Sequence, residues 1–238
     1  MLPVRSVLVD FDGTASKVDV TASLLATFGD PSWHTYDEAF ARGEIGLRDA
    51  IQAQDRMLHA DRDTLIAFAL DRGMLDPTFP PFVAWCEENG VDVAIVSDGF
   101  AFYIEPMMRT AGLGHVRVIS NEQAWRDDRP DGLRFVNAHP VCVGCGTCKM
   151  QAVLRYQERG PVAFVGEGQT DRYGALYADV TFAKLDLVAF CEADGVPFVA
   201  WEDFDDVRRA LVSAADLPGP VSPITCPGWM TPQRSRMA

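Results

Sequence analysis

Two aspartates that follow a short apolar segment are the residues of this sequence best suited to chemistry. Residues 6–10 read Ser-Val-Leu-Val-Asp, and Asp12 comes two positions after Asp10, so both side chains can leave the backbone on the same side. Two carboxylates this close are costly unless a cation or a proton compensates them. Asp10 could attack phosphorus as a nucleophile, while Asp12 could protonate a leaving alcohol and then activate water. Gly13 permits a sharp turn and Thr14 offers a hydroxyl and an amide to a phosphate, although an ordinary polar turn is the alternative interpretation.

A second apolar segment, at 91–97, also ends in small polar residues. Ser97 and the amides around Asp98 and Gly99 could hold phosphate oxygens at the start of a helix, where backbone N–H groups and the helix dipole favour anions. The same three residues are well suited to an ordinary helix cap. Phosphate binding and capping are therefore both open for this segment.

A lysine and an acidic loop complete the candidate site residues. Lys149 opens a predicted helix, where its charge opposes the helix dipole, so contact with a phosphate and with Asp10 would explain its position. Glu167 and Asp171 lie in the loop Gly-Glu-Gly-Gln-Thr-Asp after another apolar segment. Carboxylate oxygens are the ligands that Mg²⁺ prefers in proteins. A solvated lysine and surface acids are the alternative interpretations.

Apolar strand patterns alternate with helical patterns over most of the chain. The strand patterns lie at 6–10, 91–97, 116–120, 161–166, 179–183 and 197–201. This alternation predicts a doubly wound α/β fold with a parallel sheet and right-handed crossovers. Ligands of such folds bind at the carboxyl ends of the strands, which is where all four groups of candidate residues fall.

One long segment interrupts the alternation. Residues 19–80 contain no strand pattern and predict helices at 20–28, 36–41, 47–59 and 64–71. We therefore expect an α-helical insertion directly after the first strand, with core segments 1–16 and 80–217, a helical segment 17–79 and an irregular, proline-rich tail 218–238. Residues 122–136, which include Asp131-Gly132, predict a small hairpin on the core.

Composition and charge exclude several classes of partner. The 34 acids against 21 bases leave a net charge of −13, which disfavours nucleic acid and anionic membrane surfaces as partners. No segment approaches the roughly 18 apolar residues of a membrane span, and no signal peptide is visible. We expect a cytoplasmic monomer or homodimer whose six cysteines are reduced.

The order of these motifs resembles the haloacid dehalogenase superfamily over about residues 4 to 210, because residues 10–14 match its Asp-x-Asp-Gly-Thr pattern. The resemblance implies a Rossmann-like core with an inserted helical cap, as in the phosphoserine-phosphatase-like branch. It also implies that Asp10 is the nucleophile and Asp12 the general acid and base, with Ser97 and Lys149 on the phosphoryl group. Mg²⁺ would be held by the Asp10 side chain, the Asp12 carbonyl and a carboxylate of the acidic loop.

A narrower resemblance involves residues 96–100, the cysteine-rich segment that runs into Lys149, and the Gly-x-Gly-x-Thr-Asp loop. These segments look like the methionine-salvage 2-hydroxy-3-keto-5-methylthiopentenyl-1-phosphate phosphatases and their relatives. Two departures bear on function. Glu167 stands where the family has Asp, so either Glu167 or Asp171 could supply the metal ligand. Asp19 and Gln52 align with a Glu and an Arg that grip phosphoserine in its own branch, and loss of the guanidinium predicts poor activity on phosphoserine.

The cysteine-rich segment offers one imidazole and three thiols within ten residues: His139, Cys142, Cys145 and Cys148. Zinc is bound tetrahedrally by such sets, although structural zinc sites normally join two separate segments. Packed reduced thiols are the alternative, and a local disulfide or redox role is a third interpretation.

These observations lead to three functional hypotheses. The first is Mg²⁺-dependent hydrolysis of a small phosphorylated metabolite through an aspartyl-phosphate on Asp10. The second keeps the same nucleophile but transfers the phosphoryl group to an acceptor other than water, as a phosphotransferase or mutase does. The third is a weakly catalytic module that binds a phosphorylated ligand. An enolate-type sugar phosphate, phosphocholine or another phosphomonoester could be the substrate.

Overall fold

The computed structural model describes residues 2–213, 217 and 226, so the irregular tail predicted for 218–238 lies almost wholly outside the described residues. In this part of the chain seven strands form one sheet in the order β4-β3-β2-β1-β5-β6-β7. Their bounds are β1 (Ser6–Val9), β2 (Asp92–Phe100), β3 (Arg117–Arg126), β4 (Arg129–Arg134), β5 (Val162–Gly166), β6 (Val180–Ala183) and β7 (Val199–Ala200). All neighbouring strands are parallel except β3 and β4, which are antiparallel.

The sheet is doubly wound about β1. The chain passes from β1 outward through β2 to β3, then returns to β5 on the other side of β1 and continues through β6 to β7. Val9, the last residue of β1, lies opposite Ile95 of β2 and Val165 of β5. The fold class predicted from the sequence is confirmed, and the strand order reverses at β1, which is where doubly wound folds bind their ligands.

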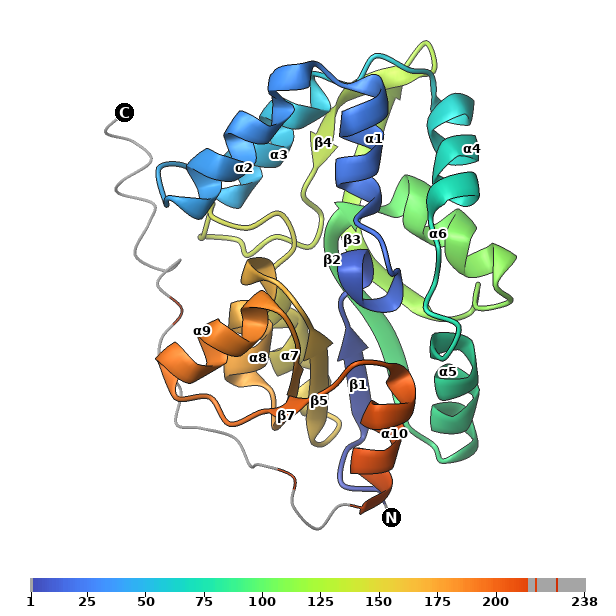
Figure 1. The fold of residues 1–238 in the computed structure, drawn as a ribbon, viewed down its shortest axis with the longest axis vertical. Coiled ribbons are helices and arrows are strands. Elements are labelled where there is room, and N and C mark those ends of the chain that lie inside the picture. The colour runs from blue at the N-terminus through green and yellow to red at the C-terminus, as the bar shows by residue number, and fades with distance from the viewer. Residues whose placement is uncertain (1, 214–216, 218–225, 227–238) are drawn as a thin grey trace.

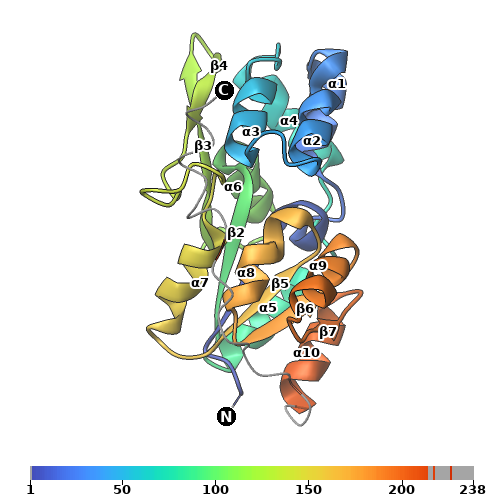
Figure 2. The same cartoon turned by 90° about the vertical axis from the view of Figure 1, so that its left-hand side faces the viewer.

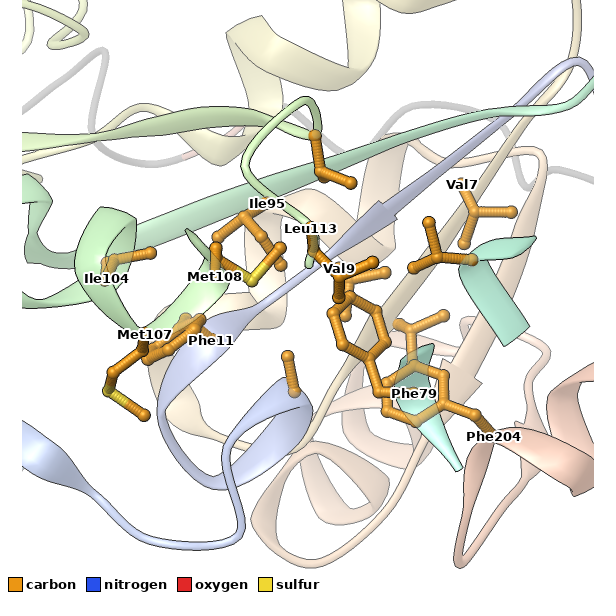
Figure 3. Packing of buried hydrophobic residues seen from close by; sticks show 14 of the residues in the cluster. Val7, Val9, Phe11, Phe79, Ile95, Ile104, Met107, Met108, Leu113 and Phe204 are labelled. Atoms are coloured by element: carbon orange, nitrogen blue, oxygen red, sulfur yellow. The ribbon is translucent and has the colours of Figure 1, made fainter. Parts of the chain in front are cut away.

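Helices cover both faces of the sheet (Figures 1 and 2). One face carries α5 (Phe79–Glu88), α6 (Ala101–Thr110) and α10 (Phe204–Ser213), and the other carries α7 (Lys149–Gln157), α8 (Arg172–Tyr177) and α9 (Asp186–Asp194). Because strand side chains alternate, Val7 and Val9 enter one apolar cluster and Leu8 enters the other. Figure 3 shows Val7 and Val9 near Phe79 and Phe204. Burial on both faces explains the continuous apolar run of β1.

Four of the five α-helices between β1 and β2 lie beyond the carboxyl end of β1 (Figure 1). They are α1 (Val20–Phe28), α2 (His34–Ala41), α3 (Leu47–Asp55) and α4 (Arg62–Arg72), with a short 3₁₀ turn at Pro31–Trp33. The segments that leave and re-enter the sheet region run side by side, since Ser16 and Leu75 form an antiparallel bridge and Lys17 N donates to Met74 O at 2.7 Å. The predicted third helix ends earlier than expected, at Asp55 rather than at 59, because the chain turns there.

The hairpin expected at 122–136 is formed by β3 and β4, but its turn lies at Asp127-Asp128 rather than at Asp131-Gly132. Both aspartates have positive φ (48° and 59°), as a two-residue hairpin turn of the favoured twist requires. The hairpin also reaches the inserted helices, because Arg62 N donates to Asp128 O at 2.8 Å. It therefore does not lie on the core alone.

Candidate active site

Asp10 and Lys149 form the centre of the site. Asp10 follows β1 at the point where the strand order reverses, and its amide N donates to Val165 O of β5 at 3.0 Å. Lys149 Nζ donates to Asp10 Oδ1 and to Asp171 Oδ1, both at 2.6 Å, and to Thr170 Oγ1 at 3.3 Å. The three charged side chains are almost fully buried. The neighbouring carboxylates raise the pKa of Lys149 against the opposing effect of burial, which keeps it a cation.

Both carboxylate oxygens of Asp171 accept hydrogen bonds from other residues of the chain. Its Oδ1 accepts from Lys149, and its Oδ2 accepts from the amides of Glu167 (2.9 Å) and Gly168 (3.0 Å). A Cβ atom on Gly166 would lie 2.6 Å from the Asp171 carboxyl group, so glycine is needed there. Asp171 therefore fixes both the lysine and the acidic loop.

Asp12 is held by two donors from other elements. Its Oδ1 accepts from Val20 N of α1 at 2.9 Å, and its Oδ2 accepts from the Tyr103 hydroxyl at 2.5 Å. Tyr103 is completely buried in α6, and its hydroxyl is also within 2.9 Å of Thr21 Oγ1. Burial, then the negative charge of Asp19, raises the pKa of Asp12, while the Tyr103 hydrogen bond acts against this rise.

Glu167 reaches the turn after Asp10. A Cβ atom on Gly13 would lie 2.6 Å from the Glu167 carboxyl carbon, and Gly13 has a φ of 75° that favours glycine. The longer side chain thus brings its carboxylate from the β5 loop against the backbone next to Asp12. Burial raises the pKa of Glu167, while nearby Lys184 lowers it.

The second motif is not a helix cap. Helix α6 starts at Ala101, its N-cap residue is Phe100, and no side chain makes a cap hydrogen bond there. Ser97 Oγ accepts from Gly99 N at 2.9 Å, and a Cβ atom on Gly99 would lie 2.7 Å from Asp12 Oδ2. Asp98 Oδ1 instead accepts from Thr147 N at 2.8 Å, so the Asp98 side chain anchors the loop that precedes Lys149.

Comparisons with known proteins agree with this fold. The family model of the haloacid dehalogenase-like hydrolases matches residues 7–175. The chain belongs to this family. It is 29% identical over 217 residues to the bifunctional enzyme MtnB/MtnX of Bacillus licheniformis, covering 89% of the chain but only 50% of that enzyme. It is 29% identical over 206 residues to the 2-hydroxy-3-keto-5-methylthiopentenyl-1-phosphate phosphatase of Brevibacillus brevis, covering 85% of the chain and 92% of that protein.

Solved structures show the same fold. A phosphoserine phosphatase from T. onnurineus has a TM-score of 0.67 at 16% identity and covers 87% of the chain and 94% of its own. A hydrolase of the same family from Salmonella enterica has a TM-score of 0.72 at 16% identity, covering 90% and 73%. The superfamily and group resemblances drawn from the sequence are confirmed. The prediction of a phosphoric monoester hydrolase is borne out by the curated relatives, which are named as phosphatases.

The acidic residues of this HAD-like site fit a hard divalent cation. Burial raises the pKa of Asp10 to about 7 with Asp171 adding to the rise, and burial also raises those of Asp12 and Glu167. Thr14 Oγ1 nearby is buried without a hydrogen-bond partner. In the described part of the chain no three His, Cys, Asp or Glu side chains are arranged to hold an ion. Mg²⁺ needs only one or two carboxylates beside backbone, water and substrate oxygens, so a site with fewer than three such side chains is compatible with it.

The two predicted substrate residues differ in their contacts with this centre. Asp19 caps α1, with its Oδ1 accepting from Ala22 N at 2.7 Å, and its charge acts on Asp12. Gln52 is half-buried on α3, and no hydrogen bond among the described residues involves its side chain. Arg48, one turn before Gln52, donates through Nη2 to Cys142 O at 3.1 Å and to Cys145 O at 2.9 Å, so part of its guanidinium binds the cysteine loop.

The four residues predicted as a zinc site do not form one in the structure. His139 Nδ1 accepts from the amides of Val141 (3.2 Å) and Cys142 (3.1 Å), so this nitrogen is used within the loop. Burial raises the pKa of Cys148 to about 11 and also raises that of Cys145, which favours thiols over the thiolates that bind zinc. The three cysteines are free thiols in a loop tied to α3 by Arg48.

Tyr103 is the site residue that the sequence did not reveal. It stands four positions after Gly99 in a helix whose other buried residues are Phe102, Ile104, Met107 and Met108, so its pattern is that of a core aromatic. Its position shortly after the second motif is the single signal that could have pointed to it.

No helix in the described part of the chain is both long and apolar enough to cross a membrane.

Proposed function

We propose that this chain is a Mg²⁺-dependent phosphatase that hydrolyses a small phosphomonoester through an aspartyl-phosphate on Asp10. The proposal rests on the two carboxylates of Asp10 and Asp12, which follow β1, the strand at which the strand order reverses. Asp10 is held by the buried ammonium group of Lys149, and Asp12 is held by Tyr103 on the other side of the same turn.

In the first step Asp10 Oδ2 attacks phosphorus while the bond from phosphorus to the ester oxygen breaks. Asp12 gives its proton to the departing alcohol, and the raised pKa of Asp12 favours the protonated form that this step needs. In the second step Asp12 takes a proton from water, whose oxygen attacks phosphorus. Inorganic phosphate leaves, and the carboxylate of Asp10 is restored.

The other site residues bind the metal ion and orient the phosphoryl group. Asp10, the Asp12 carbonyl and Glu167 would hold Mg²⁺, which when bound offsets the negative charge on the phosphoryl oxygens. Lys149 supplies a second cation, and Ser97 and Thr14 supply hydroxyl groups to the phosphoryl oxygens. Asp171 is a positioning residue in this proposal, because both of its oxygens are already bound.

The inserted helices act as a cap over the site, with residues 17–79 as cap and 1–16 and 80–217 as core. The paired connections at Ser16 and Leu75 support this division. Closure of the cap would exclude bulk water during the first step. The relatives' substrate, 2-hydroxy-3-keto-5-methylthiopentenyl-1-phosphate, is one candidate among small phosphomonoesters. We also place the protein in the cytoplasm, where buried thiols such as those of Cys86 and Cys191 stay reduced.

The test measures phosphate release from a panel of small phosphomonoesters, with Mg²⁺ and with chelator, for wild type, Asp10→Asn and Asp63→Asn. Asp63 is an exposed carboxylate of α4 and provides the matched control. We expect Mg²⁺-dependent release that Asp10→Asn abolishes and Asp63→Asn retains. Release that persists in Asp10→Asn would exclude Asp10 as nucleophile, and no release by a folded wild type would exclude hydrolysis.

A further inference from the structure

A groove with a volume near 370 Å³ lies between β3 and α7. This volume is in the range of small-molecule sites in proteins. One wall comes from Arg117 and Ile119, whose side chains leave β3 on the same face. The groove exists because β4 begins to pair with β3 only at Glu122, so no described strand covers the edge of β3 at these two residues.

The other wall is one stripe of α7 and of the residues that flank this helix. Its members recur at intervals of three and four positions, which places them on one helical face. They are Cys148, Gln151, Ala152, Arg155, Tyr156 and Arg159. Ala152 and Tyr156 pack in the same apolar cluster as Ile119, so the floor of the groove is apolar, whereas Arg155 and Arg159 remain exposed.

The groove brings together three arginines from two walls. Glu158 is the one carboxylate in its lining against Arg117, Arg155 and Arg159, in a chain of net charge −13. Among the described residues Arg117 and Arg155 have no ion-pair partner, and Arg159 has a long, exposed one, with 3.6 Å from Nη1 to Asp92 Oδ2. Like charges one helical turn apart repel each other, so the arrangement favours an anion from solution.

The ring of Tyr156 shows that the two walls act on one place. The Arg159 guanidinium carbon lies 5.5 Å from the centroid of this ring. Burial raises the pKa of the Tyr156 hydroxyl, while the positive charges of Arg117 and Arg159 lower it. The positive field of both walls is therefore felt at the same side chain.

We propose that this groove binds a small ligand with two linked phosphate groups, the diphosphate of a metabolite. Each guanidinium group can donate two parallel hydrogen bonds to phosphate oxygens. Arg155 and Arg159 are about 6 Å apart along the helix axis, a span that two linked phosphate groups fill better than one. Three arginines less Glu158 leave an excess of two positive charges, which a diphosphate neutralises.

The groove is separate from the proposed catalytic centre, and binding there does not depend on the phosphatase function. Lys149, the first residue of α7, holds Asp10 and does not line the groove. The same helix thus presents a lysine to the catalytic carboxylate and arginines to the groove.

The competing explanation gives these arginines structural roles alone. Arg155 lies in the last turn of α7 and Arg159 just beyond it, where cations offset the negative end of the helix dipole. A charged residue on an open strand edge, such as Arg117, discourages pairing with another chain. These roles predict changes in stability on substitution and no affinity for a diphosphate.

The test is calorimetric titration of the full chain with inorganic pyrophosphate in metal-free buffer of low salt. Without Mg²⁺ the acidic catalytic centre repels anions, so the heat reports the groove. Wild type, Arg117→Gln and Arg155→Gln are compared with Arg208→Gln. Arg208 is an exposed arginine of α10, on the opposite face of the sheet, and is the matched control. We expect one pyrophosphate per chain, with affinity about tenfold or more weaker in each groove variant and unchanged in Arg208→Gln.

Melting temperatures of the same proteins, with and without pyrophosphate, show that each variant is folded and give a second measure of binding. The ligand should raise the melting temperature of wild type more than that of either groove variant. No binding by wild type, or equal affinity in wild type and both groove variants, would overturn the site. Lower melting temperatures with unchanged affinity would assign the arginines to structural roles alone. Orthophosphate that binds as tightly as pyrophosphate would overturn the requirement for two phosphate groups.

Discussion

Tyr103 and Asp12, which are 91 positions apart in the sequence, are joined by a hydrogen bond of 2.5 Å from the phenol hydroxyl to the carboxylate. The bond crosses from α6 to the turn after β1 and passes over Gly99, where a Cβ atom would lie 2.0 Å from the same hydroxyl. The general acid of the proposed reaction is therefore oriented by a core tyrosine, and the second motif needs glycine to leave space for that contact.

Tyr103→Phe should lower kcat by about 10- to 100-fold, because hydrogen bonds to charged groups contribute about 1.5–3 kcal/mol. The bond lowers the pKa of Asp12, so its loss should raise that pKa and move the alkaline limb of the kcat profile, where the general acid loses its proton, to higher pH. The measurement is kcat against pH. Tyr156→Phe in α7 makes the same chemical change away from the site, and an equal loss in both variants would contradict a specific role for Tyr103.

The metal-free protein should lose stability as the pH rises. Burial, with the charge of Asp171, raises the pKa of Asp10 from 3.8 to about 7 in the folded chain. A raised folded-state pKa contributes stability that is fully present below about pH 3.8 and is lost as the pH rises through about 7. Urea midpoints measured in chelator should fall between about pH 5 and about pH 8, and Asp10→Asn should remove part of this fall. An Asp10→Asn profile identical to wild type would show that Asp10 titrates normally.

Substitutions of Glu167 and of Asp171 should impair the activity in different ways. Glu167→Gln should raise the Mg²⁺ concentration for half-maximal activity by about tenfold or more, because it removes a carboxylate from the proposed metal site. Asp171→Asn should mainly lower kcat, since Asp171 holds Lys149 and two loop amides. The measurement is activity against Mg²⁺ concentration at saturating ester. The opposite pattern would make Asp171 the metal ligand.

Arg48→Ala should expose the cysteine loop. Arg48 on α3 donates to the carbonyl oxygens of Cys142 and Cys145, and thereby joins the cap to the loop that leads into Lys149. Burial raises the pKa of the Cys145 thiol, so alkylation of wild type should be slow at pH ~7.5, where the thiol keeps its proton. The variant should react several-fold faster, as judged by mass spectrometry of the modified peptide. Arg56→Ala on the same helix is the control, and equal rates in both variants would contradict the contact.

The sequence by itself determined the elements and the outline of the site. The apolar run of β1 predicted a strand buried on both faces, and the aspartates after it were placed correctly at the carboxyl edge of the sheet. Local patterns suffice here because strand and helix periods depend on neighbouring residues alone. The alternation of these patterns also predicted a doubly wound fold, which is confirmed.

Only the tertiary structure decided which contacts each site residue makes. Asp98 could have capped a helix, and instead it binds Thr147 N, 49 positions away. Asp171 could have been a metal ligand, but Lys149 and two amides use both of its oxygens. Tyr103 has the local pattern of an ordinary helix residue. Which atoms such side chains meet depends on the crossing of elements far apart in the chain, and short-range periodicity carries no information about those distances.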